Sequence, residues 1–176
     1  LAQEFTQDDW SVKRMIRRIA MSQTYQMASD LNPKANDLDP TNRLLHRARI
    51  KRLQGEVIRD SMLSCSDEID LIMEGPSVPI FLTSFMSGRG RPGRNGPLDG
   101  ANRRSVYIEV RRNFLSPMML AFDTPIPFNS IGRRNQSNVP AQALILMNDP
   151  FVIDQANKWG AKIAQSKTSR EERISL

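Results

Sequence analysis

Apolar side chains recur every three or four residues between residues 10 and 25, which is the spacing of one helix face. They are Val12, Met15, Ile16, Ile19 and Ala20. Asp8 or Asp9 can cap the start of this helix. The basic residues Lys13, Arg14, Arg17 and Arg18 fall on the other side, where a solvated face is expected. The pattern predicts a helix from about Trp10 to Tyr25 with a buried apolar stripe.

A second helical pattern follows a loop that Pro33 and Pro40 interrupt, and it runs from about residue 43 to residue 72. Its apolar face comprises Ile50, Leu53, Val57, Ile58, Met62, Cys65 and Ile69. Glu56 and Asp60 lie within one turn of Arg52 and Arg59, an ordinary spacing for helical ion pairs. Because Cys65 follows the apolar face, we expect it to be a small buried side chain and not a nucleophile.

Residues 76–102 form a loop rich in glycine, arginine and proline. After it, Ser105 to Val110 is the best candidate for a strand, because apolar and polar residues alternate there. A short helix is expected within Phe114 to Ala121. The next helix is capped by Ser137 or Asn138, and a last helix, capped by Asp149, ends near Ser166.

These elements predict a mainly α fold with a short β element and long ordered loops. The 176 residues are enough for one domain with its own core. The chain begins with Leu1 and ends within a pattern typical of another helix. We therefore expect residues 1–176 to be a single domain and a fragment of a larger multidomain protein. No stretch approaches the roughly 20 apolar residues that a membrane helix needs.

The charge of the chain indicates anionic partners. The net charge is +6, and most of the 25 basic residues are arginines, which suit bidentate pairing with carboxylate, phosphate or sulfate. Many of these arginines can instead pair with the 19 acidic residues of the chain. The run from Arg103 to Phe151 is the expected working surface. Its candidate binding residues are Arg103, Arg104, Asp123, Arg133, Arg134, Asn138 and Gln142.

Few groups in the chain suit catalysis. Cys65 is the only cysteine, so no internal disulfide and no thiolate metal cluster can form from this chain alone. His46 is the only histidine, and we expect it to be structural. The sequence predicts no cofactor or metal in this chain, and no catalytic residue is assigned. Aromatic residues make up 6% of the chain with no stacking motif, which makes nucleic acid an improbable partner.

Three long motifs carry a resemblance to a known family. They are NRLLHRARIKRLQGEVIRDSML, GRGRPGRNGPLDGANRRSVYIEVRRNFLSPMMLAFDTPIPF and GRRNQSNVPAQALILMNDPFV. Together they resemble the planctomycete-specific domain of unknown function that lies C-terminal in large secreted proteins, over about Phe5 to Lys162. The resemblance implies an extracytoplasmic location, periplasmic or at the cell surface. It also implies a parent protein whose separate cytochrome-c-like domain would hold any haem.

Three functions follow from these observations. The first is a non-catalytic binding or scaffold module that contacts other domains of its parent protein, with acidic or sulfated glycans or an acidic partner domain as ligand. The second is an enzyme acting on glycans through carboxylates, with Asp99, Glu109, Asp123 and Asp149 as candidates. The third, suggested by the resemblance alone, is an accessory domain for cytochrome-c-type electron transfer.

Overall fold

The computed structural model describes residues 1–166, and these divide into two compact units. The first unit is Leu1–Arg52 and the second begins at Leu53. The first contains α1 (Ala2–Gln7), α2 (Val12–Ala20) and α3 (Pro33–Leu38). The second contains α4 (Gly55–Cys65), the 3₁₀ turns η1 (Gly100–Asn102) and η2 (Ser105–Tyr107), α5 (Pro117–Ala121), α6 (Pro140–Asn148) and α7 (Pro150–Ser166).

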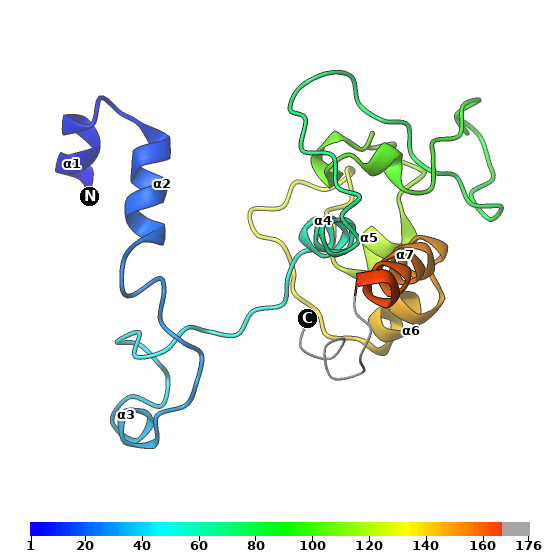
Figure 1. Ribbon diagram of the computed structural model, residues 1–176. Helices are drawn as coiled ribbons and strands as arrows, with labels where there is room; N and C mark the ends of the chain where they lie inside the picture. The colour runs from blue at the N-terminus through cyan, green and yellow to red at the C-terminus, as the bar shows by residue number, and fades with distance from the viewer. Residues whose placement is uncertain (167–176) are drawn as a thin grey trace. The chain divides into compact units, whose positions relative to one another are not determined.

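The mainly α prediction is confirmed, because helices joined by long loops make up the described residues 1–166 and no β-sheet occurs among them (Figure 1). Within the same residues, no helix is both long and apolar enough to cross a membrane. The prediction of a single domain within a larger protein stays a prediction.

In the first unit, α2 contacts α1 through charged side chains. Arg18 pairs with Glu4 at 3.2 Å and with Asp8 at 3.3 Å. The predicted buried stripe is therefore wrong: Val12 is 62% exposed and Ile16 is 60% exposed. The helix also ends at Ala20, five residues earlier than predicted. Its start is capped by Ser11, not by Asp8 or Asp9, which leaves the Asp8 carboxylate available for the ion pairs.

The segment from residue 43 to residue 54, predicted to be helical, is a loop, and Asp39 fixes its start. The carboxylate of Asp39 accepts hydrogen bonds from the backbone N–H groups of Arg43 (3.0 Å) and Leu44 (2.7 Å). These two bonds lower the pKa of Asp39, since they favour its ionised form. The Asp39 carbonyl lies 3.1 Å from Nε2 of His46. Hydrogen bonds to the Asp39 carboxylate thus replace the backbone hydrogen bonds that these N–H groups would make in a helix.

Asn42 fixes the other side of this loop. Its side chain is 3% exposed, and its amide donates to the Arg47 carbonyl at 2.8 Å and accepts from the Arg47 N–H at 3.3 Å. Asn42 and Leu45 adopt positive φ angles of 54° and 57°. Left-handed backbone at two nearby positions is incompatible with a helix.

In the second unit, α4 is the central helix. Leu63 is fully buried, and its core partners are Met118, Phe122 and Phe151. Gly55, at the first position of α4, permits close packing, because a Cβ there would lie 3.2 Å from Cβ of Phe122. The predicted burial of Cys65 is wrong: the thiol is exposed. Two residues correspond to about 200° around a helix, so Cys65 lies on the side of α4 opposite to Leu63.

The buried side chain of Arg59 joins α4 to residues 99–105, where the glycine-rich loop ends. Its guanidinium donates to the carbonyls of Asp99 (2.5 Å) and Arg103 (2.9 Å) and to Oγ of Ser105 (3.1 Å). Burial lowers the pKa of Arg59, and the charges of Asp60 and Asp99 oppose that change. Arg59 also contacts the Asp60 carboxylate at 3.5 Å. These four contacts are called the Arg59 cluster.

The predicted strand from Ser105 to Val110 is wrong. Ser105 is held against α4, because its N–H and its hydroxyl both donate to the Asp60 carboxylate, at 2.7 and 2.6 Å. The chain turns at η2 before it can extend. Within this segment, Ile108 forms an isolated bridge with Val78, and no strand results.

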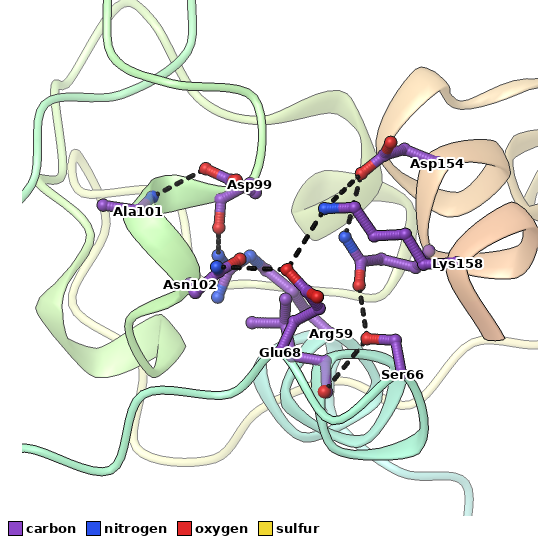
Figure 2. Close-up of polar contacts among 10 residues, drawn as sticks. Arg59, Ser66, Glu68, Asp99, Ala101, Asn102, Asp154 and Lys158 are labelled. Carbon is purple, nitrogen blue, oxygen red and sulfur yellow. Dashed lines mark hydrogen bonds and ion pairs between the residues drawn. The ribbon is translucent and has the colours of Figure 1, made fainter. Parts of the chain in front are cut away.

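A second polar network fastens α7 to the same region. Figure 2 shows Lys158 of α7 between Asp154 and Glu68, at 3.1 and 3.4 Å. Glu68 also accepts a hydrogen bond from Asn102, at 3.4 Å. Beside it, the Ser66 hydroxyl donates to the amide oxygen of Gln155, at 2.6 Å. The predicted last helix and its Asp149 cap are confirmed, since α7 runs from Pro150 to Ser166 and Asp149 accepts from the Phe151 N–H.

Replacing Arg59 by alanine is expected to lower the free energy of unfolding by about 3–5 kcal/mol, because buried acceptors lose a charged donor. Urea denaturation followed by circular dichroism measures the change. Arg104→Ala is the control: this arginine is exposed, and its loss is expected to cost less than about 0.5 kcal/mol. Equal losses in both variants would contradict the central role of Arg59.

The loop held by Asp39 is expected to depend on pH. Because the folded pKa of Asp39 is lowered from 3.8, its contribution to stability is present above that value and is lost as pH falls through the folded pKa. The amide chemical shifts of Arg43 and Leu44 should therefore titrate below pH 3.8. The Asp39→Ala variant should show no such transition. A transition that persisted in this variant would assign the effect to another group.

Candidate functional site

A pocket of about 230 Å³ opens in the second unit where α4, η2 and α5 meet. Glu56, Ser105 and Met119 represent these three elements in its wall. The other lining residues are Ile80, Ile108, Glu109, Val110, Leu115, Ser116, Leu120, Thr124, Pro125 and Arg134. Apolar side chains form most of the surface, and a few polar groups stand among them, which is the usual composition of a ligand pocket.

One ion pair crosses the wall of this pocket. Arg134 donates to the Glu56 carboxylate at 2.8 Å and to the side-chain oxygen of Gln54 at 3.1 Å. Burial opposes ionisation of Glu56, but the hydrogen bond and the charge of Arg134 outweigh it, so the pKa of Glu56 is lowered. Glu56 is therefore a stable anion at neutral pH, and its charge is compensated by Arg134.

Glu109 and Thr124 are among the other polar residues that line the pocket. The Glu109 carboxylate pairs with Arg111 at 2.6 Å. The hydroxyl of Thr124 is buried and has no hydrogen-bond partner among residues 1–166. A buried hydroxyl without a partner costs free energy, so it is a position where a polar group of a ligand would be favoured.

Two of the predicted binding residues have structural roles beside the pocket. Asp123 has a positive φ of 59°, and its carboxylate accepts from the N–H (2.7 Å) and the hydroxyl (2.9 Å) of Ser137. Gln142 is 6% exposed and donates to the carbonyls of Ala121 (2.9 Å) and Ser137 (3.1 Å). Together they hold the loop before α6 against α5. Ser137 therefore does not cap α6, whose N-cap residue is Val139.

Arg103 is also engaged within the protein. It donates to the carbonyls of Ile72 (3.2 Å) and Glu74 (2.6 Å) and lies over the ring of Tyr107 at 4.1 Å. Its side chain is 14% exposed. Arg103 thus supports the backbone around residues 70–75 and is not available to a ligand without breaking these contacts.

The remaining predicted residues lie on the surface or in the pocket. Arg104, Arg133 and Asn138 are exposed, whereas Arg134 lines the pocket. Arg104 precedes the lining residue Ser105, and Arg133 precedes Arg134. Sequence reasoning missed Glu56 as a site residue, because its partner Arg134 is 78 positions away and helical spacing suggested only local partners.

Residues 1–166 contain no group of three or more His, Cys, Asp or Glu side chains arranged to hold a metal ion. A family model described as PSD1, a protein of unknown function (DUF1553), matches residues 1–176. The chain belongs to this family. No curated protein and no solved structure matches the chain. The resemblance to a domain of unknown function is therefore confirmed for DUF1553, while the planctomycete origin and the cytochrome-like neighbours stay predictions.

The Asp123→Ala variant is expected to lose about 2–4 kcal/mol of stability, because it removes hydrogen bonds to a carboxylate and places alanine at a left-handed φ. Asp123→Gly should lose less, since glycine tolerates that φ. Thermal or urea unfolding measures both. Asn138→Ala, at an exposed position, should be close to the wild type. A neutral Asp123→Gly variant would show that the hydrogen bonds to Ser137 contribute little.

Proposed function

We propose that the second unit is a non-catalytic binding module of an exported multidomain protein, and that its pocket receives an acidic segment from another domain of the same protein. The observation that carries this proposal is the largely apolar lining of the pocket, in which Arg134 is already paired with Glu56. Arg104 and Arg133, which are exposed, adjoin lining residues in the chain. In this proposal, an apolar side chain of the acidic segment fills the pocket. Carboxylates of that segment form ion pairs with Arg104 and Arg133.

The candidate carboxylates support binding over catalysis. A general acid for glycoside hydrolysis needs a raised pKa, whereas the pKa of Glu56 is lowered. The four carboxylates considered for an enzyme each have a local partner. Asp99 accepts from Ala101 N–H, Glu109 pairs with Arg111, Asp123 accepts from Ser137, and Asp149 accepts from Phe151 N–H.

The wider setting belongs to the same proposal and rests on the family resemblance. The module would work outside the cytoplasm, and any haem would belong to a separate domain of the parent protein. Acidic or sulfated glycans are the alternative ligands for the exposed arginines. Among residues 53–166, no contact favours the electron-transfer role in particular.

Photo-crosslinking in the full-length parent protein tests the proposal. A benzophenone amino acid at position 110, where Val110 lines the pocket and is 68% exposed, should form a cross-link to an acidic segment of another domain. The same amino acid at position 85, where Phe85 is 93% exposed and does not line the pocket, is the control. Mass spectrometry identifies the linked peptide.

Charge variants test whether the two exposed arginines contribute to the cross-linked complex. Replacing Arg104 and Arg133 by glutamine should reduce the yield of the cross-link from position 110 several-fold at low salt, and the difference should shrink at high salt. A cross-link to a basic or neutral segment, or the same peptides from positions 85 and 110, would overturn the proposal.

A further inference from the structure

The first unit contains a basic groove that the proposed function does not use. It has a volume of about 520 Å³ and lies between residues 19–25 and residues 45–51. Its polar lining consists of three cations, Arg47, Arg49 and Lys51, and three hydroxyl side chains, Ser22, Thr24 and Tyr25. No acidic side chain is among the described residues that line it. This set of donors is suited to an anion that also carries hydroxyl groups.

Hydrogen bonds to the backbone fix the segment that carries the three cations. Buried Asn42 makes two hydrogen bonds to the backbone of Arg47. One residue further on, the N–H of Ala48 donates to the Ala28 carbonyl at 2.9 Å. The three cations occupy alternate positions of this segment, and all three line the groove. The groove therefore presents a prearranged row of positive charge.

The charges of this row are not neutralised within the described part of the chain. Arg47 donates to the side-chain oxygen of Asn36 at 3.5 Å, and Arg49 donates to the Thr41 carbonyl at 3.4 Å, and both acceptors are neutral. The buried Nε of Arg47 has no hydrogen-bond partner in residues 1–166. By contrast, Arg18 of α2 pairs with two carboxylates. The groove thus contains charged donors without an anionic acceptor.

We propose that this groove binds a segment of an anionic glycan, a sugar chain that bears sulfate or carboxylate groups. The arginines would pair with the anionic groups in the bidentate geometry that guanidinium favours, with Lys51 as a point charge beside them. Ser22 and Thr24 would contact sugar hydroxyls. Tyr25 is the only aromatic lining residue, whereas channels for single-stranded nucleic acid offer several rings on which bases stack. The site is independent of the pocket in the second unit.

Calorimetric titration of the chain with four probes tests this proposal. The probes are a heparin-derived hexasaccharide, a uronate-only hexasaccharide, a single-stranded oligonucleotide of the same charge and inorganic sulfate. At least one hexasaccharide should bind more tightly than the oligonucleotide and the sulfate ion, and the affinity should fall as salt is added. The two hexasaccharides distinguish sulfate from carboxylate as the recognised group.

Two triple variants with the same loss of charge locate the site. Replacement of Arg47, Arg49 and Lys51 by glutamine should weaken hexasaccharide binding at least tenfold. Replacement of Arg89, Arg91 and Arg94, in the glycine-rich loop, should change it less than threefold. In the wild type, the amide signals of Ser22, Thr24 and Ala48 should shift on titration, a readout that does not depend on how a variant folds.

Three results would overturn the proposal. The first is the absence of binding by both hexasaccharides, or binding no tighter than that of sulfate. The second is an oligonucleotide that binds as tightly as the better hexasaccharide, which would indicate a nucleic-acid surface. The third is an equal loss of affinity in the two triple variants, which would indicate a general effect of net charge.

Discussion

The second unit depends on one buried cation. The Arg59 guanidinium lies inside the protein and donates to backbone carbonyls at Asp99 and Arg103 and to the Ser105 hydroxyl. A buried charge is costly unless its donors are satisfied, so the segment that supplies the acceptors must follow the side chain closely. Gly100 meets this requirement: its φ is +62°, and a Cβ there would lie 2.5 Å from the Arg59 guanidinium. The path of residues 99–105 is therefore set by a polar contact with α4 and not by a sheet.

The candidate pocket follows from the Arg59 cluster. Ser105, which the cluster holds against Asp60, is part of the pocket wall, and Glu56 lies one turn before Asp60 on the same helix. The opposite wall comes from α5, whose close approach to α4 requires Gly55. Loss of the Arg59 contacts would thus displace a pocket wall as well as destabilise the unit. For this reason the stability of the unit and the shape of the candidate pocket are coupled through Arg59, which does not itself line the pocket.

Local signals in the sequence predicted the local elements and failed where a distant partner decided the outcome. The Asp149 cap and the last helix were predictable, because a cap and the apolar periodicity of α7 are both properties of adjacent residues. The strand from Ser105 to Val110 was not, because Asp60, 45 positions away, holds Ser105 in a turn. Likewise, Asp39 draws the following residues into a loop that apolar spacing alone identifies as a helix. The site residues followed the same rule: Arg134 was found, but its partner Glu56 was not.

The arginines of this chain differ in the partners that they bind, and the net charge of the sequence does not show these differences. Arg59 and Arg103 bind backbone carbonyls, and Arg134 is neutralised by Glu56. The positive net charge therefore overstates what the expected working surface offers a ligand. Arg47 and Arg49 differ, because within residues 1–166 they meet neutral acceptors. An uncompensated charge favours an anion more strongly than a paired one, since no existing ion pair has to be broken. On this argument Arg47 and Arg49 of the first unit are suited to an anion as well as the exposed Arg104 and Arg133, although they lie outside the run from Arg103 to Phe151 that the sequence singled out.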